Sequence, residues 1–144
     1  MYNLFFIPAL FIIFLYNPIK NLNKEYAKVR ISDKLNLTVE IANTKFKQSK
    51  GLMFTKPLSK KEGMFFIFKN SKKRSFYNKN VSFNVLLFWI NQDFTIVGYT
   101  VLNKNSFNTH TSPNPIKYVL ELNYDLFTVN PNSLVGKKVN LEFF

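Results

Sequence analysis

The sequence predicts an all-β domain, a mostly antiparallel barrel or sandwich with one or two short helices, behind an N-terminal hydrophobic helix. Three observations support this prediction: many short strand-like runs, little helical periodicity, and a leading stretch of 19 residues without charge. A chain of 144 residues has room for one such domain. We divide it into a hydrophobic segment over 1–19, a polar tether over 20–34 and a β-rich domain over 35–144.

The leading segment is typical of a membrane anchor or a signal peptide. Residues 4–16 are almost purely apolar, and Tyr2 and Tyr16 stand where interfacial aromatic residues are favoured. As a helix the segment would span about 28 Å, which is at the short end of what crosses a bilayer. No basic residue precedes it and no clear cleavage site follows it, so an uncleaved anchor is favoured. A membrane is therefore the partner expected for residues 1–19.

Six runs predict the strands of the domain. Residues 37–41 alternate between apolar and polar side chains, which indicates a strand with one wet face, whereas residues 64–68 are continuously apolar and indicate a strand covered on both faces. Residues 91–93 are turn-forming and predict a hairpin. The complete set of predicted strands is 37–41, 64–68, 83–90, 94–102, 118–122 and 139–143.

Short helices and loops are expected between these strands. Asn43 and Thr44 can cap a helix over Lys45–Lys50, which Gly51 would end. Residues 103–115 are rich in Asn, Ser, Thr and Pro and predict a loop. Residues 124–134 have room for one helical turn, interrupted at Pro131.

The positive charge is concentrated in one part of the chain. The net charge is +12, and residues 45–79 contain eleven basic residues against the single acid Glu62. Such a footprint predicts an anionic partner, and anionic lipid, an envelope polymer or a small polar ligand would suit a membrane-tethered protein. A solvated face enriched in lysine is the alternative. Nucleic acid is less favoured, since no helix-turn-helix, zinc or RNP pattern is present.

The residue inventory argues against several kinds of chemistry. The chain has no Cys and one His, so thiolate sites, disulfides and multi-histidine metal sites are not expected. Neither a metal nor a cofactor is predicted. A small hydrolase-type enzyme with a site near His110 or Glu121 is the alternative function. Ser106 and Ser112 lie near this histidine, but no nucleophile-elbow pattern accompanies them.

A polar block near the centre of the chain is the best candidate for ligand binding. It offers cationic donors, amides and an aromatic face, which suit a carboxylate, a phosphate or a sugar. Glu121, an acid on the predicted strand 118–122, is a further candidate beside this block. Alternatively, the end of the block is a structured turn and the acid simply points outward. The candidate ligand-binding residues are Arg74, Tyr77, Asn78, Lys79, Asn80 and Glu121.

Several blocks resemble the bacterial family called domain of unknown function 192. They are IANT at 41–44, GLMF at 51–54, EGMFFIF at 62–68, YVLEL at 118–122 and GKKV at 136–139. In the central block Lys79 and Asn80 follow the family's pattern, whereas Tyr77, Asn78 and Leu86 stand where the family has Trp, Met and Asp. The resemblance implies a compact β-rich domain, usually exported behind a signal or anchor, with no established activity.

The resemblance also bears on which side of the membrane the domain lies. Lys20, Lys24, Lys28 and Arg30 follow the apolar segment and favour a cytoplasmic domain by the positive-inside rule. Export of the family outweighs this charge count. We therefore expect a membrane-anchored, extracytoplasmic domain on the periplasmic or cell-envelope side that binds a polar or anionic envelope ligand.

Overall fold

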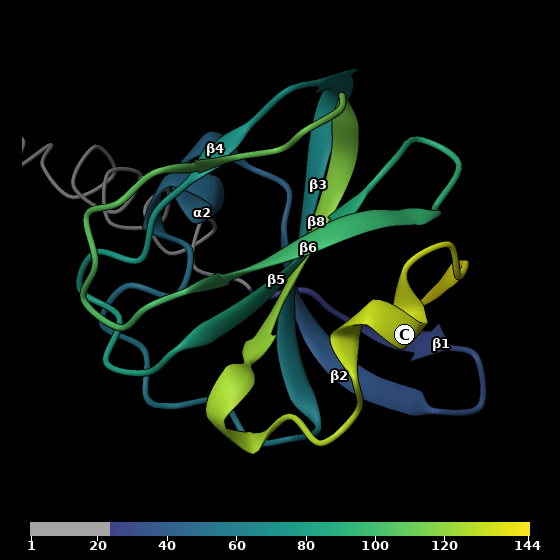
Figure 1. Cartoon of the computed structure of the whole chain (residues 1–144), viewed down its shortest axis with the longest axis horizontal. Helices are drawn as coiled ribbons and strands as arrows, with labels where there is room; N and C mark the ends of the chain where they lie inside the picture. Colours follow the sequence, from purple (N-terminus) through teal and green to yellow (C-terminus); the bar gives the residue numbers. More distant parts are fainter. Residues whose placement is uncertain (1–23) are drawn as a thin grey trace, which may run out of the picture.

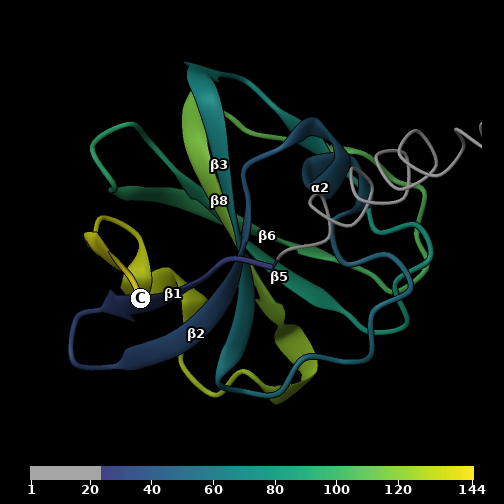
Figure 2. The ribbon, with the colours of Figure 1, turned by 180° about the vertical axis from the view of Figure 1, so that it is seen from behind.

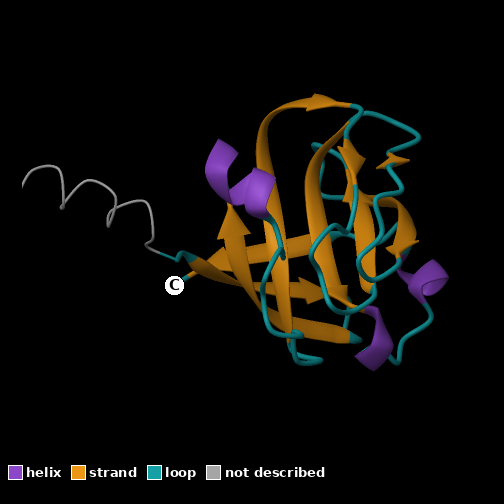
Figure 3. Cartoon of the chain, turned by 90° about the vertical axis from the view of Figure 1, so that its left-hand side faces the viewer, coloured by secondary structure: helices purple, strands orange, loops and turns teal. Residues whose placement is uncertain are grey.

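The computed structural model describes residues 24–144, and strands are the main regular structure in them, with only short helices (Figures 1 and 3), which confirms the all-β class. The large sheet has seven strands in the order β6-β5-β8-β3-β2-β1-β9, and a second sheet pairs β4 with β7. The elements are β1 (Tyr26–Ile31), β2 (Leu35–Ala42), α2 (Lys45–Lys50), β3 (Glu62–Lys72), β4 (Ser75–Phe76), β5 (Val85–Ile90), β6 (Ile96–Leu102), β7 (His110–Thr111), β8 (Ile116–Asn123), η1 (Tyr124–Leu126), η2 (Pro131–Leu134) and β9 (Val139–Phe143).

The predicted hydrophobic helix over 1–19 and the first residues of the predicted tether lie outside the described residues. In the part of the chain that the structure covers, 24–144, none of the helices has the length and apolar character needed to span a bilayer.

The large sheet curls until its two edges meet. Backbone hydrogen bonds run from Val139 to Phe94 (2.8 Å) and from Ile96 to Lys137 (3.0 Å), so the segment before β9 contacts the segment before β6. Neighbouring strands pair antiparallel except for β2 and β3, which are parallel. The prediction of a mostly antiparallel sheet is therefore correct.

The continuous apolar runs are central strands with two covered faces, as expected. One face of β3, β5 and β8 packs into an inner core that contains Phe65, Phe88 and Leu120. The opposite face of the same strands packs into a second core that contains Phe66 and Leu87. Because successive side chains of a strand point to opposite faces, each run must be apolar at every position. This second face is the one that carries the candidate site.

Strand β1 lies within the segment 20–34 that the sequence predicted to be a polar tether, so that prediction is wrong for residues 26–31. The charged residues within 26–31 favour a polar linker, yet these residues form a strand between β2 and β9. Its apolar residues alternate with the charged ones, and Ala27, Val29 and Ile31 are fully buried in the inner core. In Figures 1 and 2 the β1–β2 hairpin lies on the opposite side of the molecule from α2.

Helix α2 follows from the parallel pairing of β2 with β3. Parallel neighbours need a crossover connection, and residues 43–61 supply one that contains α2. The side chain of Thr44 accepts a hydrogen bond from the Lys47 backbone N–H (3.2 Å), which begins the helix as predicted. Gly51, at φ +49°, ends it by donating its N–H to the Lys47 carbonyl (2.8 Å).

The small sheet of β4 and β7 faces α2 across the second core. It pairs Ser75 with Thr111 and Phe76 with His110, so the predicted loop over 103–115 contains a short strand. The Ser75 and Thr111 hydroxyl oxygens lie 2.7 Å apart and hold the two strands together at the surface. The second core is therefore covered by α2 on one side and by β4 on the other.

Candidate binding pocket

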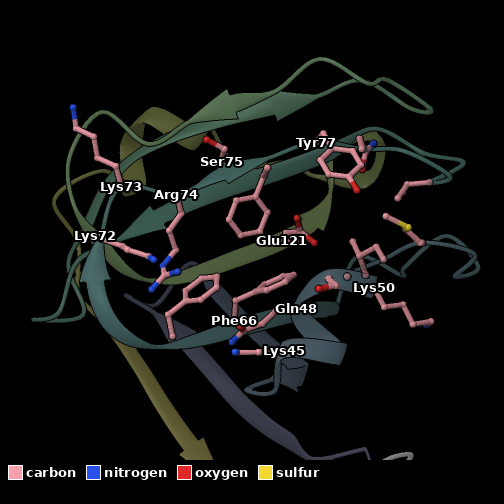
Figure 4. Close-up of a pocket in the computed structure, with 18 residues that line it drawn as sticks. Lys45, Gln48, Lys50, Phe66, Lys72, Lys73, Arg74, Ser75, Tyr77 and Glu121 are labelled. Carbon is pink, nitrogen blue, oxygen red and sulfur yellow. The ribbon is translucent and has the colours of Figure 1, made fainter.

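A pocket of about 580 Å³ opens between α2 and β4, and we call it the α2–β4 pocket (Figure 4). This volume is within the range of small-molecule sites. Its lining combines basic side chains, aromatic rings and one acid. The lining residues are Lys45, Gln48, Ser49, Lys50, Gly51, Leu52, Met53, Phe66, Phe68, Lys72, Lys73, Arg74, Ser75, Phe76, Tyr77, Asn78, Val81 and Glu121.

Three phenylalanine rings form one wall of the pocket. Phe66 stacks on Phe68 with ring centroids 6.2 Å apart, and Phe76 meets both rings edge-on at 5.3 and 6.2 Å. Behind this wall the only tryptophan, Trp89, makes an edge contact with Phe76 at 5.7 Å. Phe68 and Phe76 are only partly buried, so the wall offers apolar ring surface to whatever enters the pocket.

Arg74 is fixed at one end of this wall. Its guanidinium carbon lies 3.8 Å from the centroid of the Phe68 ring. Its Nη2 donates to both the backbone carbonyl and the side-chain oxygen of Asn70, each at 2.8 Å. Its buried Nε has no hydrogen-bond partner among residues 24–144, and partial burial lowers the pKa of Arg74 below its ordinary value. The guanidinium is thus held in place with donor capacity still unused.

Glu121 is buried within the pocket lining, and its side chain lies between the α2 side and the β4 side in Figure 4. It is 5% exposed, and burial alone, without a hydrogen-bonding or charged neighbour from residues 24–144, governs its titration. Its oxygens are not among the fully buried atoms that lack a partner in this part of the chain, so they reach the space of the pocket. Desolvation raises the pKa of Glu121 to about 8. The carboxyl is therefore mostly protonated at neutral pH, and it can both donate and accept a hydrogen bond.

The pocket brings together four of the six predicted ligand-binding residues. Arg74, Tyr77, Asn78 and Glu121 all line it. Tyr77 is 46% exposed and contributes ring surface at the mouth. Asn78 has a structural part, since its buried amide donates to the carbonyls of Phe83 (3.0 Å) and Asn103 (3.1 Å).

Lys79 and Asn80 are not among the residues that line this pocket. The Lys79 ammonium lies 5.6 Å from the centroid of the Phe107 ring, on a neighbouring loop. Asn80 has a φ of +56°, and its carbonyl accepts the Phe54 N–H at 2.9 Å. Both residues therefore belong to a structured turn beside the pocket, as the alternative interpretation of the sequence held.

The sequence predicted that lysines neighbouring the central block take part in binding, but it did not identify which basic residues complete the rim. Lys45 and Lys50 come from α2, and Lys72 and Lys73 come from the end of β3 and the turn before β4. All four belong to the basic segment 45–79, which was the available signal. Their convergence depends on the crossover that carries α2, and no local pattern reveals that packing.

The residues of the alternative enzymatic site are not brought together. His110 lies in β7, where its Nδ1 is 3.0 Å from the Thr100 hydroxyl, and it does not line the pocket with Glu121. The Ser112 hydroxyl instead accepts the Arg74 backbone N–H at 3.1 Å. Across residues 24–144, no cluster of three or more His, Asp or Glu residues could hold a metal ion.

A protein-family model described as Uncharacterized ACR, domain of unknown function 192, matches residues 27–139. The matched stretch extends from β1 to the first residue of β9 and includes every pocket residue. The chain belongs to the domain of unknown function 192 family. This membership confirms the resemblance drawn from the sequence. Leu86, which stands where that family's pattern has Asp, is fully buried in the inner core, on the face of β5 opposite Leu87.

The fold of this protein is also found in two crystal structures of bacterial proteins. One, from Sinorhizobium meliloti 1021, is named a "putative transcription regulator"; it is 26% identical, with a TM-score of 0.69 over 83% of this chain and 94% of that chain. The other is a protein of unknown function from Novosphingobium aromaticivorans; it is 23% identical, with a TM-score of 0.69 over 85% of this chain and 89% of that chain. No curated protein matches the chain.

Proposed function

We propose that this protein binds a small polar or anionic ligand in the α2–β4 pocket. The observation that carries the proposal is a largely buried carboxyl, Glu121, which no other residue of 24–144 hydrogen-bonds, in a cavity whose rim is basic. Burying a polar group without a hydrogen bond costs stability, so such groups call for an explanation. A ligand that hydrogen-bonds to this carboxyl inside the pocket explains why an acid stands in so desolvated a place.

The rim supplies the electrostatic part of recognition. Five basic side chains surround the pocket, from α2 on one side and from the turn before β4 on the other: Lys45, Lys50, Lys72, Lys73 and Arg74. Glu121, the only acid in the lining, is mostly neutral at pH 7 because of its raised pKa. The pocket therefore attracts anionic groups at its rim and offers an uncharged hydrogen-bonding group further in.

Charge reversal at the rim tests this function. The full-length chain in detergent micelles is titrated calorimetrically with inorganic phosphate, 4-hydroxybenzoate and adenosine 5′-monophosphate. At least one of these anions should bind, and the pair Lys72→Glu with Lys73→Glu should weaken its binding. The matched control is Lys60→Glu with Lys61→Glu, two exposed neighbouring lysines of the same basic segment that do not line the pocket. Binding that is absent for all three anions, or equally affected by both pairs, contradicts the proposal.

We also propose that the domain works beside a membrane, on its extracytoplasmic side. The uncharged leading segment over residues 1–19 supports this placement. A second support is a loop patch that we define by Phe54, Phe107, Lys56, Lys79 and Lys104. Phe54 and Phe107 are 81% and 72% exposed. Exposed rings among lysines are suited to the interface of an anionic bilayer.

The loops of this patch lie side by side. Phe54, Lys56 and Asn105 line one shallow hollow, and the Asn105 N–H donates to the Val81 carbonyl at 2.9 Å. Cell fractionation with protease treatment of intact cells tests the placement. The membrane fraction should contain the protein, and added protease should digest its domain; recovery as a free cytoplasmic protein would refute the proposal.

Nucleic-acid binding is a second candidate function. The name of the Sinorhizobium meliloti protein and the net charge of residues 45–79 favour it. Its signature would be retention on nucleic acid at low salt that falls steeply as the salt concentration rises. Absence of retention at low salt would eliminate this candidate.

A further inference from the structure

We infer that the ligand of the α2–β4 pocket is a planar-ring compound that carries an acidic group. This inference rests on the proposed function and specifies the chemical class of the ligand. Three surfaces of different chemistry meet in the pocket: the basic rim near Arg74, the phenylalanine wall, and Glu121. A ligand that uses all three needs an acid, a flat apolar body and a polar substituent.

The wall accounts for the planar ring. Phe68 and Phe76 are partly exposed and stand edge-on to each other, with ring centroids 6.2 Å apart. Rings pack against such surfaces in offset-stacked or edge-to-face arrangements, at centroid separations of about 4.5–7 Å. A bare inorganic anion would leave this apolar surface in contact with water. A ring covers the surface and gains contact area from it.

The acid belongs at the Arg74 end. There the guanidinium is immobilised by the Phe68 ring and by the two bonds from Nη2 to Asn70. A fixed guanidinium binds carboxylate or phosphate with little loss of side-chain freedom. Lys72, at the end of β3, lies beside Arg74 in Figure 4, and Lys73 lies at the same end with its side chain directed outward, so both add positive charge there.

Glu121 accounts for the polar substituent. In Figure 4 its carboxyl lies away from Arg74, toward the side where Tyr77 and Lys50 are drawn. A hydroxyl or an amino group on the ring would satisfy it. An aromatic carboxylate with a hydroxyl and a nucleoside monophosphate with an amino-bearing base share this chemistry, so the test includes a probe of each kind.

The experiment compares each ring acid with fragments that lack one feature. The full-length chain in micelles is titrated with 4-hydroxybenzoate, benzoate, cyclohexanecarboxylate and phenol, and with adenosine 5′-monophosphate, adenosine and ribose 5-phosphate. In at least one series the complete probe should bind tenfold or more tightly than each fragment. Ribose 5-phosphate or inorganic phosphate binding as tightly as the ring acids would overturn the inference, although it would still support an anion-binding pocket. Absence of all binding would overturn the proposed function as well.

Variants assign each feature to a residue. Arg74→Gln should weaken binding of the ring acids by about tenfold or more without affecting the uncharged fragment, because charge-assisted bonds are the stronger ones. Arg30→Gln is its control, since Arg30 is the only other arginine and lies in β1. Phe76→Leu should remove most of the advantage of a ring over cyclohexanecarboxylate, whereas Phe46→Leu, an exposed ring outside the pocket, should not.

Glu121 needs two variants, because a change at a buried site can disturb folding. Glu121→Met removes hydrogen bonding at similar length and should cancel the difference between 4-hydroxybenzoate and benzoate, or between the nucleotide and its fragments. Glu121→Gln keeps a neutral hydrogen-bonding group and should retain most of the affinity. Circular dichroism confirms folding of each variant. Undiminished affinity in a folded Glu121→Met protein would overturn the assignment.

Discussion

The guanidinium carbon of Arg74 lies over the ring of Phe68, 3.8 Å from its centroid, and Asn70 holds the guanidinium there. Both supporting residues belong to β3, so the end of this strand positions the cation at the pocket rim. Asn70 is a positioning residue in this arrangement, because its side-chain oxygen contacts Arg74 and it does not line the pocket.

Asn70→Ala should therefore weaken ring-acid binding without unfolding the domain. It removes one of the two bonds to Nη2, and we expect about a threefold to tenfold loss of affinity from the loosened guanidinium. Asn70→Asp keeps an acceptor oxygen and should preserve the position of Arg74. Asn108→Ala, in an exposed loop, is the control. Calorimetric titration measures the effect; equal affinity for Asn70→Ala and Asn108→Ala would show that Arg74 needs no such support.

Glu121 should make the stability of the fold depend on pH. The unfolded carboxyl has a pKa of about 4.3, whereas the folded one has a pKa of about 8. Between these values the folded state holds the proton more tightly than the unfolded state does. Its free energy of unfolding therefore falls as the pH rises through this window, by at most about 1.4 kcal/mol per pH unit. Above the folded pKa this contribution no longer changes.

Glu121→Gln removes this titration and should gain stability relative to the wild type as the pH rises. Urea denaturation between pH 5 and pH 9, at intervals of about one unit, measures the difference. Glu142→Gln is the matched control, because Glu142 lies in β9 with a side chain that is 70% exposed. A Glu121→Gln profile parallel to that of the wild type would mean that the carboxyl is charged in the folded protein.

Gly63 allows β3 to lie close to β8 at the level of Glu121. A Cβ at this position would be 2.8 Å from Leu122 Cδ2 and 3.0 Å from the Glu121 carbonyl oxygen. Because one obstacle is backbone, Gly63→Ala should lower the free energy of unfolding by about 1–3 kcal/mol. Gly98→Ala is the control, since its Cβ would meet only Trp89 Cδ1 at 3.6 Å. Urea denaturation should separate the two variants; equal stability would show that β8 yields at this position.

Local patterns were sufficient for most of the fold. The apolar runs at 64–68 and 83–90 predicted doubly covered strands, and Thr44 with Gly51 marked both ends of α2. Strand β1 is not predicted, because the charges of Lys28 and Arg30 favour a linker. The alternation of Ala27, Val29 and Ile31 was present, but its meaning depends on partners from β2 and β9 that are distant in sequence.

The site was predictable only in part, and for a physical reason. Arg74 and Tyr77 flank β4, so a block of sequence could identify them, and Glu121 is an acid on a predicted strand. Lys45 and Lys50 join them through the crossover between β2 and β3. Chain reversals that bring such distant segments together leave no periodic signal. Residue type alone did not reveal that Lys79 turns toward Phe107.

Asn78 and Asn80 should differ in how much their substitution destabilises the fold, although they are near neighbours. The buried Asn78 amide satisfies the carbonyls of Phe83 and Asn103, so Asn78→Ala should cost about 1–3 kcal/mol of folding free energy. At Asn80 the fold depends on the left-handed backbone conformation, with φ +56°, which glycine also adopts readily. Asn80→Gly should therefore leave the free energy of unfolding nearly unchanged. Urea midpoints of the two variants check this contrast. A large loss in Asn80→Gly would mean that its side chain makes a contact of its own.

The loop patch should contact an anionic bilayer. Phe54 is held at φ +59°, a strained conformation for a bulky residue, and its ring is nevertheless 81% exposed. In the full-length chain reconstituted into vesicles, tryptophan introduced by Phe54→Trp or Phe107→Trp should be quenched by lipids brominated on their acyl chains. Quenching should be stronger with phosphatidylglycerol than with phosphatidylcholine, because Lys56, Lys79 and Lys104 favour anionic headgroups.

Phe46→Trp, an exposed position on α2 outside the patch, is the control, and the buried Trp89 gives the background. Quenching at Phe46→Trp equal to that at the two patch positions would show that the domain approaches the bilayer without using this face.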